Sequence, residues 1–508
     1  MNTVAHEAGR GPVAAVALIG ASAALLAIAV VGGASSPFLA VLVAFATVVA
    51  VTRPGFIGWP QILGVLVLLI MFVPIRRYTL PGDLPFELEP YRIYIAVIIV
   101  GWCASLLVDR RTRLRRTGFE GPLIVIVGAM MASILANPAR VAEFASDVNK
   151  SLTFFLSFVV LLYVIASVLR GVESADFLAR SLVTGGTVVA LFAIVEARTG
   201  FNIFNYLSRV LPALQPTELG LSGGFVRVGA AKLRVFGSAE HPIALSAALV
   251  MLVPLALYLA RRDGRRRWLL CATALTVASW AAVSRTGIVM FVVVGIVFLW
   301  LRPQETRRLW PLLIPALIVI KLMLPGTLGA IKQSFLPAGG IVAEQQSAAD
   351  GSGSGRLADL GPALEAWKRE PLFGQAYATM PIIRPGAALE TNVLDNQWLS
   401  TLLSIGVVGF AGWLWFFGRA VRRFGAEARR DRSDRGWLLV AVTAGIAAYG
   451  VGMLTYDAFA FIQVTFVMFI LVGIGSSVLA ERPSPLVVVA APGESRAAAH
   501  RTATAGVT

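Results

Sequence analysis

The sequence has few charged residues for its length. Only 14% of its 508 residues are charged, and 57% belong to the hydrophobic set. Soluble domains carry about 25% charged residues. The mean hydropathy is +0.77. This excludes an ordinary soluble domain, because so large an excess of apolar residues is not compatible with a water-exposed surface. Apolar runs near 20 residues recur between charged clusters, and this pattern predicts a polytopic helical membrane protein.

Cysteine is nearly absent, and so are the motifs of nucleotide-dependent and metal-dependent enzymes. Cys103 and Cys271 both lie in apolar runs and predict neither a disulfide nor a metal site. No Asp-x-Asp and no Walker loop occurs, so the sequence implies no metal ion, no ATP and no other cofactor. The net charge of +16 suggests nucleic acid at first sight. The basic residues stand in short clusters at helix ends, however, so membrane topology explains them better and we expect no nucleic-acid partner.

The apolar runs define about fourteen candidate spans, and the fold class they predict is all-α. The run from Pro12 to Val31 is longer than the core of a signal peptide, so we interpret it as the first span, with a cleaved signal as the alternative. The full set covers residues 12–31, 36–52, 58–75, 91–108, 121–136, 150–169, 181–197, 242–260, 268–283, 287–301, 310–324, 396–417, 437–454 and 459–480.

Arginine placement predicts the orientation. With both termini in the cytoplasm, most arginines of the short connections fall on the inner side, as the positive-inside rule requires. Two long loops then lie outside. The predicted organisation is N-terminal helices in 1–197, a first outer loop at 198–241, central helices in 242–324, a large outer loop with short helices at 325–395, C-terminal helices in 396–480, and a disordered cytoplasmic tail at 481–508.

The first outer loop carries basic residues on the side where such residues are disfavoured. Arg227, Lys232 and Arg234 precede a span and are suited to hold phosphate oxygens through charge-assisted hydrogen bonds. The alternative is a solvated loop with side chains that snorkel to the interface. His241 is the one histidine outside the two tails. It is a candidate base, or a histidine that merely begins a helix.

Three further residues stand where spans meet the outer face. Arg285 lies at an outer turn between two apolar runs; an arginine at membrane depth is a functional candidate by default, and an interfacial helix end is the alternative. Asp395 and Asn396 lie where the chain re-enters the membrane. Asp395 either caps that helix or accepts a proton from a hydroxyl. The acidic pair Glu87 and Glu89 in another outer loop is interpreted as loop polarity rather than as a metal or acid–base pair.

The order of these short motifs resembles one family. RVFGSAEHP is followed by VSRTG, then by GRLADLGPALEAWKREPLFG in the large outer loop, then by DNQWLSTLLSIGVVG, and the last span begins near TYDAFAFIQ. Over about residues 190–480 this order is similar to the O-antigen ligase and polymerase superfamily of bacterial membrane glycosyltransferases. Members typically place a histidine near the re-entering helix, where this chain has Asp395. Asp395 or His241 is then the base, or no strong base is needed.

The resemblance implies a reaction at the outer face of the inner membrane. A glycan on a polyprenyl-diphosphate donor would pass to the hydroxyl of a glycan or lipid-linked glycan acceptor, by ligation or polymerisation, without metal. Outer arginines hold the diphosphate in such ligases, which maps onto Arg234 and Arg285, and we add Arg356. Fixed arginines stabilise the charge that builds on the leaving diphosphate, and direct displacement inverts the anomeric centre. The main alternative is a transporter or flippase of a lipid-linked precursor.

The stretch from Gly351 to Gly374 is polar within a chain of apolar runs. Its pattern predicts a helix over about 361–369, with Pro362 in the first turn. Pro371 and Gly374 end the element. Leucines and Trp367 at helical spacing form an apolar stripe that suits the membrane surface or the spans. We therefore expect a lid over a lipid-facing active site.

Overall fold

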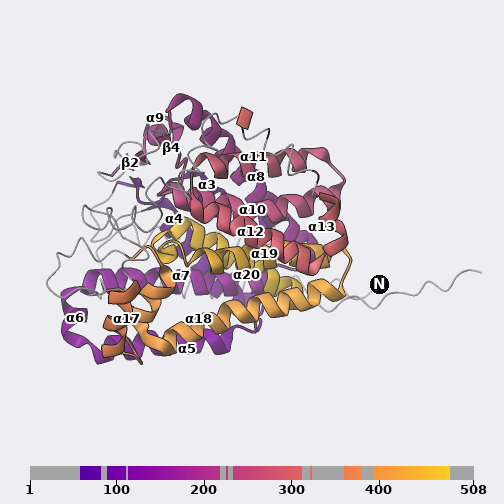
Figure 1. Ribbon diagram of the computed structural model, residues 1–508. Helices are drawn as coiled ribbons and strands as arrows, with labels where there is room; N and C mark the ends of the chain where they lie inside the picture. Colours follow the sequence, from indigo (N-terminus) through magenta and orange to yellow (C-terminus); the bar gives the residue numbers. More distant parts are fainter. Residues whose placement is uncertain are drawn as a thin grey trace, which may run out of the picture.

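The computed structural model describes residues 58–81, 89–109, 112–217, 225–226, 233–309, 311, 318, 321–322, 360–379 and 394–480. Within these ranges the chain is helical, apart from two pairs of two-residue strands. The all-α prediction is therefore confirmed for the described part. Seven of its helices are long and apolar enough to cross a membrane, which supports a multi-pass membrane protein (Figure 1).

Eleven of the fourteen predicted spans coincide with helices. The predicted spans 12–31 and 36–52, and almost all of 310–324, lie outside the described residues, as does the tail 481–508. The matching helices are α3 (Trp59–Phe72), α4 (Pro90–Val108), α5 (Glu120–Ala136), α7 (Ala145–Val168), α8 (Gly171–Thr199), α10 (Pro242–Asp263), α11 (Arg266–Ala281), α12 (Arg285–Leu301), α18 (Gln397–Arg430), α19 (Asp434–Gly452) and α20 (Ile462–Ala480).

Shorter elements connect these helices. They are α6 (Pro138–Glu143), η1 (Ile203–Tyr206), α9 (Leu207–Val210), α13 (Pro303–Leu309), α17 (Leu360–Arg369) and η5 (Ala458–Ala460). Strand β1 (Tyr78–Thr79) pairs antiparallel with β2 (Gln215–Pro216), and β3 (Phe225–Val226) pairs antiparallel with β4 (Leu233–Arg234).

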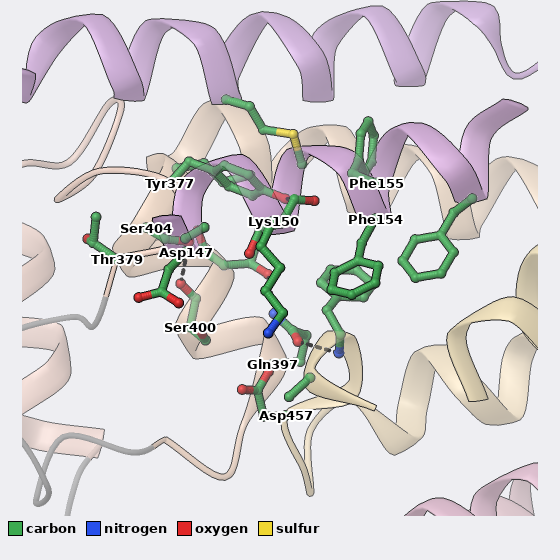
Figure 2. Close-up of a pocket in the computed structure, with 18 of the residues that line it drawn as sticks. Asp147, Lys150, Phe154, Phe155, Tyr377, Thr379, Gln397, Ser400, Ser404 and Asp457 are labelled. Carbon is green, nitrogen blue, oxygen red and sulfur yellow. Dashed lines mark hydrogen bonds between the residues drawn. The ribbon is translucent and has the colours of Figure 1, made fainter. Parts of the chain in front are cut away.

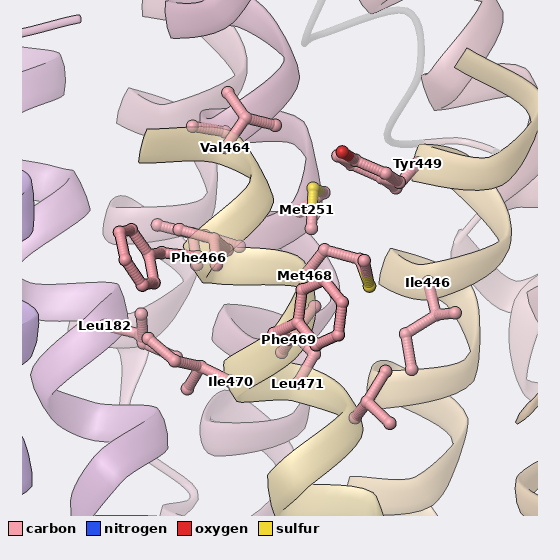
Figure 3. Close-up of a cluster of buried hydrophobic side chains, with 14 of the residues drawn as sticks. Leu182, Met251, Ile446, Tyr449, Val464, Phe466, Met468, Phe469, Ile470 and Leu471 are labelled. Carbon is pink, nitrogen blue, oxygen red and sulfur yellow. The ribbon is translucent and has the colours of Figure 1, made fainter. Parts of the chain in front are cut away.

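Three helices form the centre of the molecule. The apolar windows of α10 and α19 are each 83% buried, and that of α20 is 94% buried. These helices are apolar on every side, as expected for helices surrounded by other helices. Figure 3 shows Met251 of α10, Ile446 of α19 and Phe469 of α20 packed together. By contrast α5 exposes large apolar side chains such as Ile124 and Leu135, which suits contact with lipid.

The basic connections gather at one end of the bundle. Arg423, late in α18, donates to the carbonyl of Thr117 just before α5. Arg302, after α12, donates to the carbonyl of Asp431 after α18, and Arg261 of α10 lies 3.2 Å from a carboxylate oxygen of Asp434. These loops therefore share one face, as the orientation requires. Which face is cytoplasmic stays a prediction.

Two helices extend further than the apolar runs predicted. The span at 181–197 lies in α8, which starts at Gly171, and the span at 396–417 lies in α18, which continues to Arg430. The added turn in α8 carries Asp176, which is buried and pairs with Arg262. The predicted spans were ended at the first charged residues. The helices continue past them at the membrane surface, because the charges are paired and the residues are good helix formers.

Helix α18 is broken near its start. Gly406 has φ 65° and ψ −170°, which no other residue adopts readily, so the helix bends there. The turn that follows α17 fills the break: the amide of Val407 donates to the carbonyl of Pro371 at 2.9 Å, and the amide of Gln375 donates to the carbonyl of Leu403 at 2.8 Å. The break thus anchors the turn after α17 to α18.

Helix α17 confirms the predicted helix, starting one residue earlier at Leu360. Pro362 lies in its first turn, and the helix ends before Pro371. Its buried face consists of Ala363 and Ala366, packed against three leucines at the start of α18 and just before it (Leu394, Leu399 and Leu403). The described leucines of the predicted stripe, Leu360 and Leu364, are instead exposed. That exposure leaves them available to a membrane surface.

Candidate active site

The motif RVFGSAEHP is braced by an arginine from another segment. Arg77, between α3 and β1, is 6% exposed and donates to the carbonyls of Gly237 and Ala239. From α8, Glu196 accepts the amide of Gly237 at 2.9 Å. Burial lowers the pKa of Arg77 to about 10, so it stays protonated at neutral pH. The motif is therefore held rigidly where it enters α10.

The two arginines expected to hold a diphosphate meet at one turn. Arg234, the last residue of β4, donates from Nε to the carbonyl of Ala282 at 3.2 Å. Arg285 is the first residue of α12, three positions further along that turn. Both side chains are half-buried. The described residues therefore bring the first outer loop and the Ser-Arg motif together.

Helix α12 begins with unused hydrogen-bonding capacity. Ser284 is its N-cap residue, but the side chain makes no capping hydrogen bond. The hydroxyl of Ser284 has no partner among the described residues, although the residue is only 4% exposed. Free amides at a helix start, with the positive end of the helix dipole, favour an anion. With Arg285 and Arg234 beside it, this helix start can hold a phosphate group.

The same helix start is joined to the turn between α19 and α20. The hydroxyl of Thr455 donates to that of Thr286 at 2.8 Å. The start of α18 is pinned to that turn as well. The amide of Gln397 donates to the carbonyl of Tyr456 at 3.1 Å, and its side-chain oxygen accepts the amide of Phe459 at 2.8 Å. The starts of α12 and α18 thus converge on the segment 455–459.

Asp457 lies in this segment and is a further candidate base. Burial, with a smaller contribution from the charge of Asp395, raises its pKa to about 7, against a lowering by Arg76. A carboxylic acid with a pKa near neutrality is suited to accept a proton at physiological pH. The predicted Asp395 is therefore near the base position, but Asp457 is the residue that faces the cavity described next.

A cavity of about 410 Å³ opens beside Asp457 (Figure 2). Its walls come from α5, α7, the segment after α17, the start of α18, and η5. Aromatic rings and small polar groups alternate around it. The lining includes Arg76, Asp147, Lys150, Phe154, Phe155, Phe158, Tyr377, Thr379, Gln397, Ser400, Thr401, Ser404, Trp413, Asp457 and Phe459.

An ion pair joins the cavity to the motif before α10. Arg76 Nε lies 3.7 Å from Glu240 Oε1, and the Glu240 side chain is 8% exposed. Burial raises the pKa of Glu240 to about 7, with Arg76 acting against this rise. The other oxygen of Glu240 accepts the amide of Ile462 at 3.2 Å, at the start of α20. Glu89 accepts the amide of Arg76 at 2.6 Å, which gives that loop carboxylate a structural role.

His241 and Asn396 cap helices. Nδ1 of His241 accepts the amide of Ile243, and its ring stacks on Phe461. Asn396 accepts the amide of Leu399 at 3.2 Å and is the N-cap residue of α18. The capping alternative for Asp395 is therefore wrong, because its neighbour takes that position. Three other candidates lie outside the described residues: Arg227, Lys232 and Arg356.

Sequence reasoning missed three residues that the fold makes prominent. Arg76 and Arg77 follow the span at 58–75 on the predicted outer side, against the positive-inside trend. The same departure from the positive-inside trend identified Arg234, so Arg76 and Arg77 could have been identified from the sequence. Asp457 stands in the quoted TYDAFAFIQ, but only the folded chain shows that it faces a cavity.

One comparison with known proteins matches this region. Residues 270–414 match the family described as O-antigen ligase. The match includes Arg285 and Asp395 but ends before Asp457 and begins after Arg234. It confirms the resemblance inferred from motif order. No curated protein matches the chain.

Proposed function

We propose that this chain, whose residues 270–414 match the family described as O-antigen ligase, transfers a glycan from a polyprenyl-diphosphate carrier to an acceptor hydroxyl. The family and the apolar helices support a membrane protein of glycan ligation or polymerisation in general. The start of α12 carries the finer proposal. It combines an unpartnered, buried Ser284 hydroxyl with Arg285 and the tethered Arg234.

In the proposed reaction the donor diphosphate lies at the start of α12. The acceptor hydroxyl attacks the anomeric carbon, and a new carbon–oxygen bond forms as the bond to the diphosphate oxygen breaks. The electron pair leaves with the diphosphate, whose growing negative charge Arg234 and Arg285 stabilise. The hydroxyl proton passes to the carboxylate of Asp457. Direct displacement inverts the anomeric configuration.

The positions of the arginines favour this reaction over transport. Arg285 begins a helix and Arg234 ends strand β4, so neither lies in the middle of a span. A transporter is expected to carry its charged groups near the midplane, between repeated halves. An extracytoplasmic, multi-pass enzyme of the bacterial inner membrane agrees better with these placements.

The test is transfer by the purified chain from a lipid-linked glycan fraction of the source cells. Arg285→Ala and Arg234→Ala should each abolish transfer while the protein still folds. Arg209→Ala, an exposed arginine of α9 in the same outer loop, is the matched control and should retain activity. Full activity in both arginine variants would contradict the proposed function.

Ser284→Ala gives a finer readout. Removing a buried hydroxyl without a partner should leave stability equal or slightly higher. If the hydroxyl binds the donor phosphate, the KM for the donor should nonetheless rise. An unchanged donor KM would place the diphosphate elsewhere.

A further inference from the structure

The cavity beside Asp457 has groups that the donor does not use. Phe154 and Phe155 of α7 present rings to it, and Ser400 and Gln397 of α18 present polar groups (Figure 2). Sites for small polar molecules combine apolar walls with a few placed hydrogen-bonding groups. A saccharide suits this mixture, since its ring has apolar C–H faces and a rim of hydroxyls.

One segment contacts both the cavity and the proposed donor anion site. Thr455 contacts the start of α12 through Thr286 at 2.8 Å, whereas Asp457 and Phe459, a few residues on, line the cavity. An in-line displacement needs the acceptor hydroxyl opposite the leaving diphosphate, with the base beside the hydroxyl. An acceptor that enters from the cavity would bring its hydroxyl to Asp457 in this segment.

Lys150 adds a donor that has no partner within the part of the chain that the structure describes. It extends from α7 toward Gln397 and Asp457 across the cavity (Figure 2). Among the described residues no carboxylate lies within ion-pair distance of it, even though Asp147 is one turn away on the same helix. Its ammonium can therefore donate up to three hydrogen bonds to a ligand.

We propose that this cavity binds the terminal sugar of the acceptor glycan, between the rings of α7 and the polar face of α18. The proposal rests on the proposed function. A volume of about 410 Å³ lies in the range of small-molecule sites and suits about one or two sugar rings. The hydroxyl that reacts points to Asp457, which takes its proton as the new glycosidic bond forms.

A kinetic split tests the proposal. Phe154→Ala and Lys150→Met should raise the KM for the acceptor by about tenfold or more and leave the KM for the donor unchanged. Phe177→Ala, which removes a half-exposed phenylalanine of α8 away from the cavity, should change neither constant. A rise in donor KM, or no change in either constant, would overturn the proposal.

A binding readout separates this proposal from the transfer reaction itself. Ser400→Cys, in a chain with Cys103 and Cys271 replaced by serine, places a thiol in the cavity wall. The probe is the surface polysaccharide of the source cells, freed of lipid by mild acid and added without donor. It should slow maleimide labelling of the thiol several-fold. Unprotected labelling at saturating polysaccharide would overturn the acceptor site, whereas absent transfer with protected labelling would instead count against the proposed function.

Discussion

The break in α18 makes a strong prediction about stability. Gly406 lies in a backbone region that is essentially restricted to glycine. An added Cβ would collide with the backbone of Leu372 in the turn after α17. Gly406→Ala should therefore strain the backbone and also push this turn away, with loss of the hydrogen bond from Val407 to Pro371.

The magnitude follows from these two effects. A residue held in a disfavoured region costs about 1–3 kcal/mol. Loss of one backbone hydrogen bond adds about 1 kcal/mol. The free energy of unfolding should thus fall by roughly 2–4 kcal/mol. Gly418→Ala on the same helix meets open space and should be stabilising by about 0.5–1 kcal/mol, because alanine is the better helix former.

Unfolding of the purified chain in mixed micelles with increasing SDS, followed by tryptophan fluorescence, measures both variants. The two midpoints should move in opposite directions. Equal midpoints for Gly406→Ala and Gly418→Ala would refute the account of the break. Transfer should fall with Gly406→Ala, because the segment before the break carries Gln397 and Ser400 of the cavity wall.

Three further outcomes are expected. The rate of transfer should rise with pH through about 7, because the raised pKa of Asp457 keeps its carboxyl protonated below that value. Asp457→Asn should remove both this rise and most of the rate. Asp395→Asn should leave both the rise and the rate in place. Arg77→Met should lower the free energy of unfolding by about 1–3 kcal/mol, since buried carbonyls lose their donor, whereas the exposed Arg113→Met should leave it unchanged. His241→Asn should keep both stability and turnover, because asparagine also caps helices; a drop of about 10²–10⁴ in turnover would make the histidine a base after all.

The helices were predictable because membrane spans carry their signal locally. Each needs a run of apolar residues, and every predicted span within the described ranges became a helix, although α8 and α18 extend well beyond their apolar runs. The ends were less predictable. Asp176 looked like a loop residue, but it is buried against Arg262 and Tyr258, so α8 continues through it. Partners that come from a distant helix cannot be read from a local pattern.

In the candidate site, too, some residues were predictable from the sequence and others were not. Arg234 and Arg285 stood out because each violates a charge trend, and the fold brings both to one turn. Asp395 was chosen as base because it lies at a membrane re-entry point. The choice between Asp395 and Asp457 depends on which carboxylate faces a cavity, and that cavity is built from segments more than 300 residues apart, from Lys150 to Asp457. Sequence order contains no such information.

The arrangement also explains why a polar segment belongs in this lipid-soluble chain. The turn after α17 replaces the hydrogen bonds that α18 loses at Gly406, so the outer loop is fastened to a span at its C-terminal end. The same bend directs the start of α18 toward the segment 455–459, where Gln397 is bonded. The turn after α17 and the cavity wall at the start of α18 are therefore connected through the bend at Gly406.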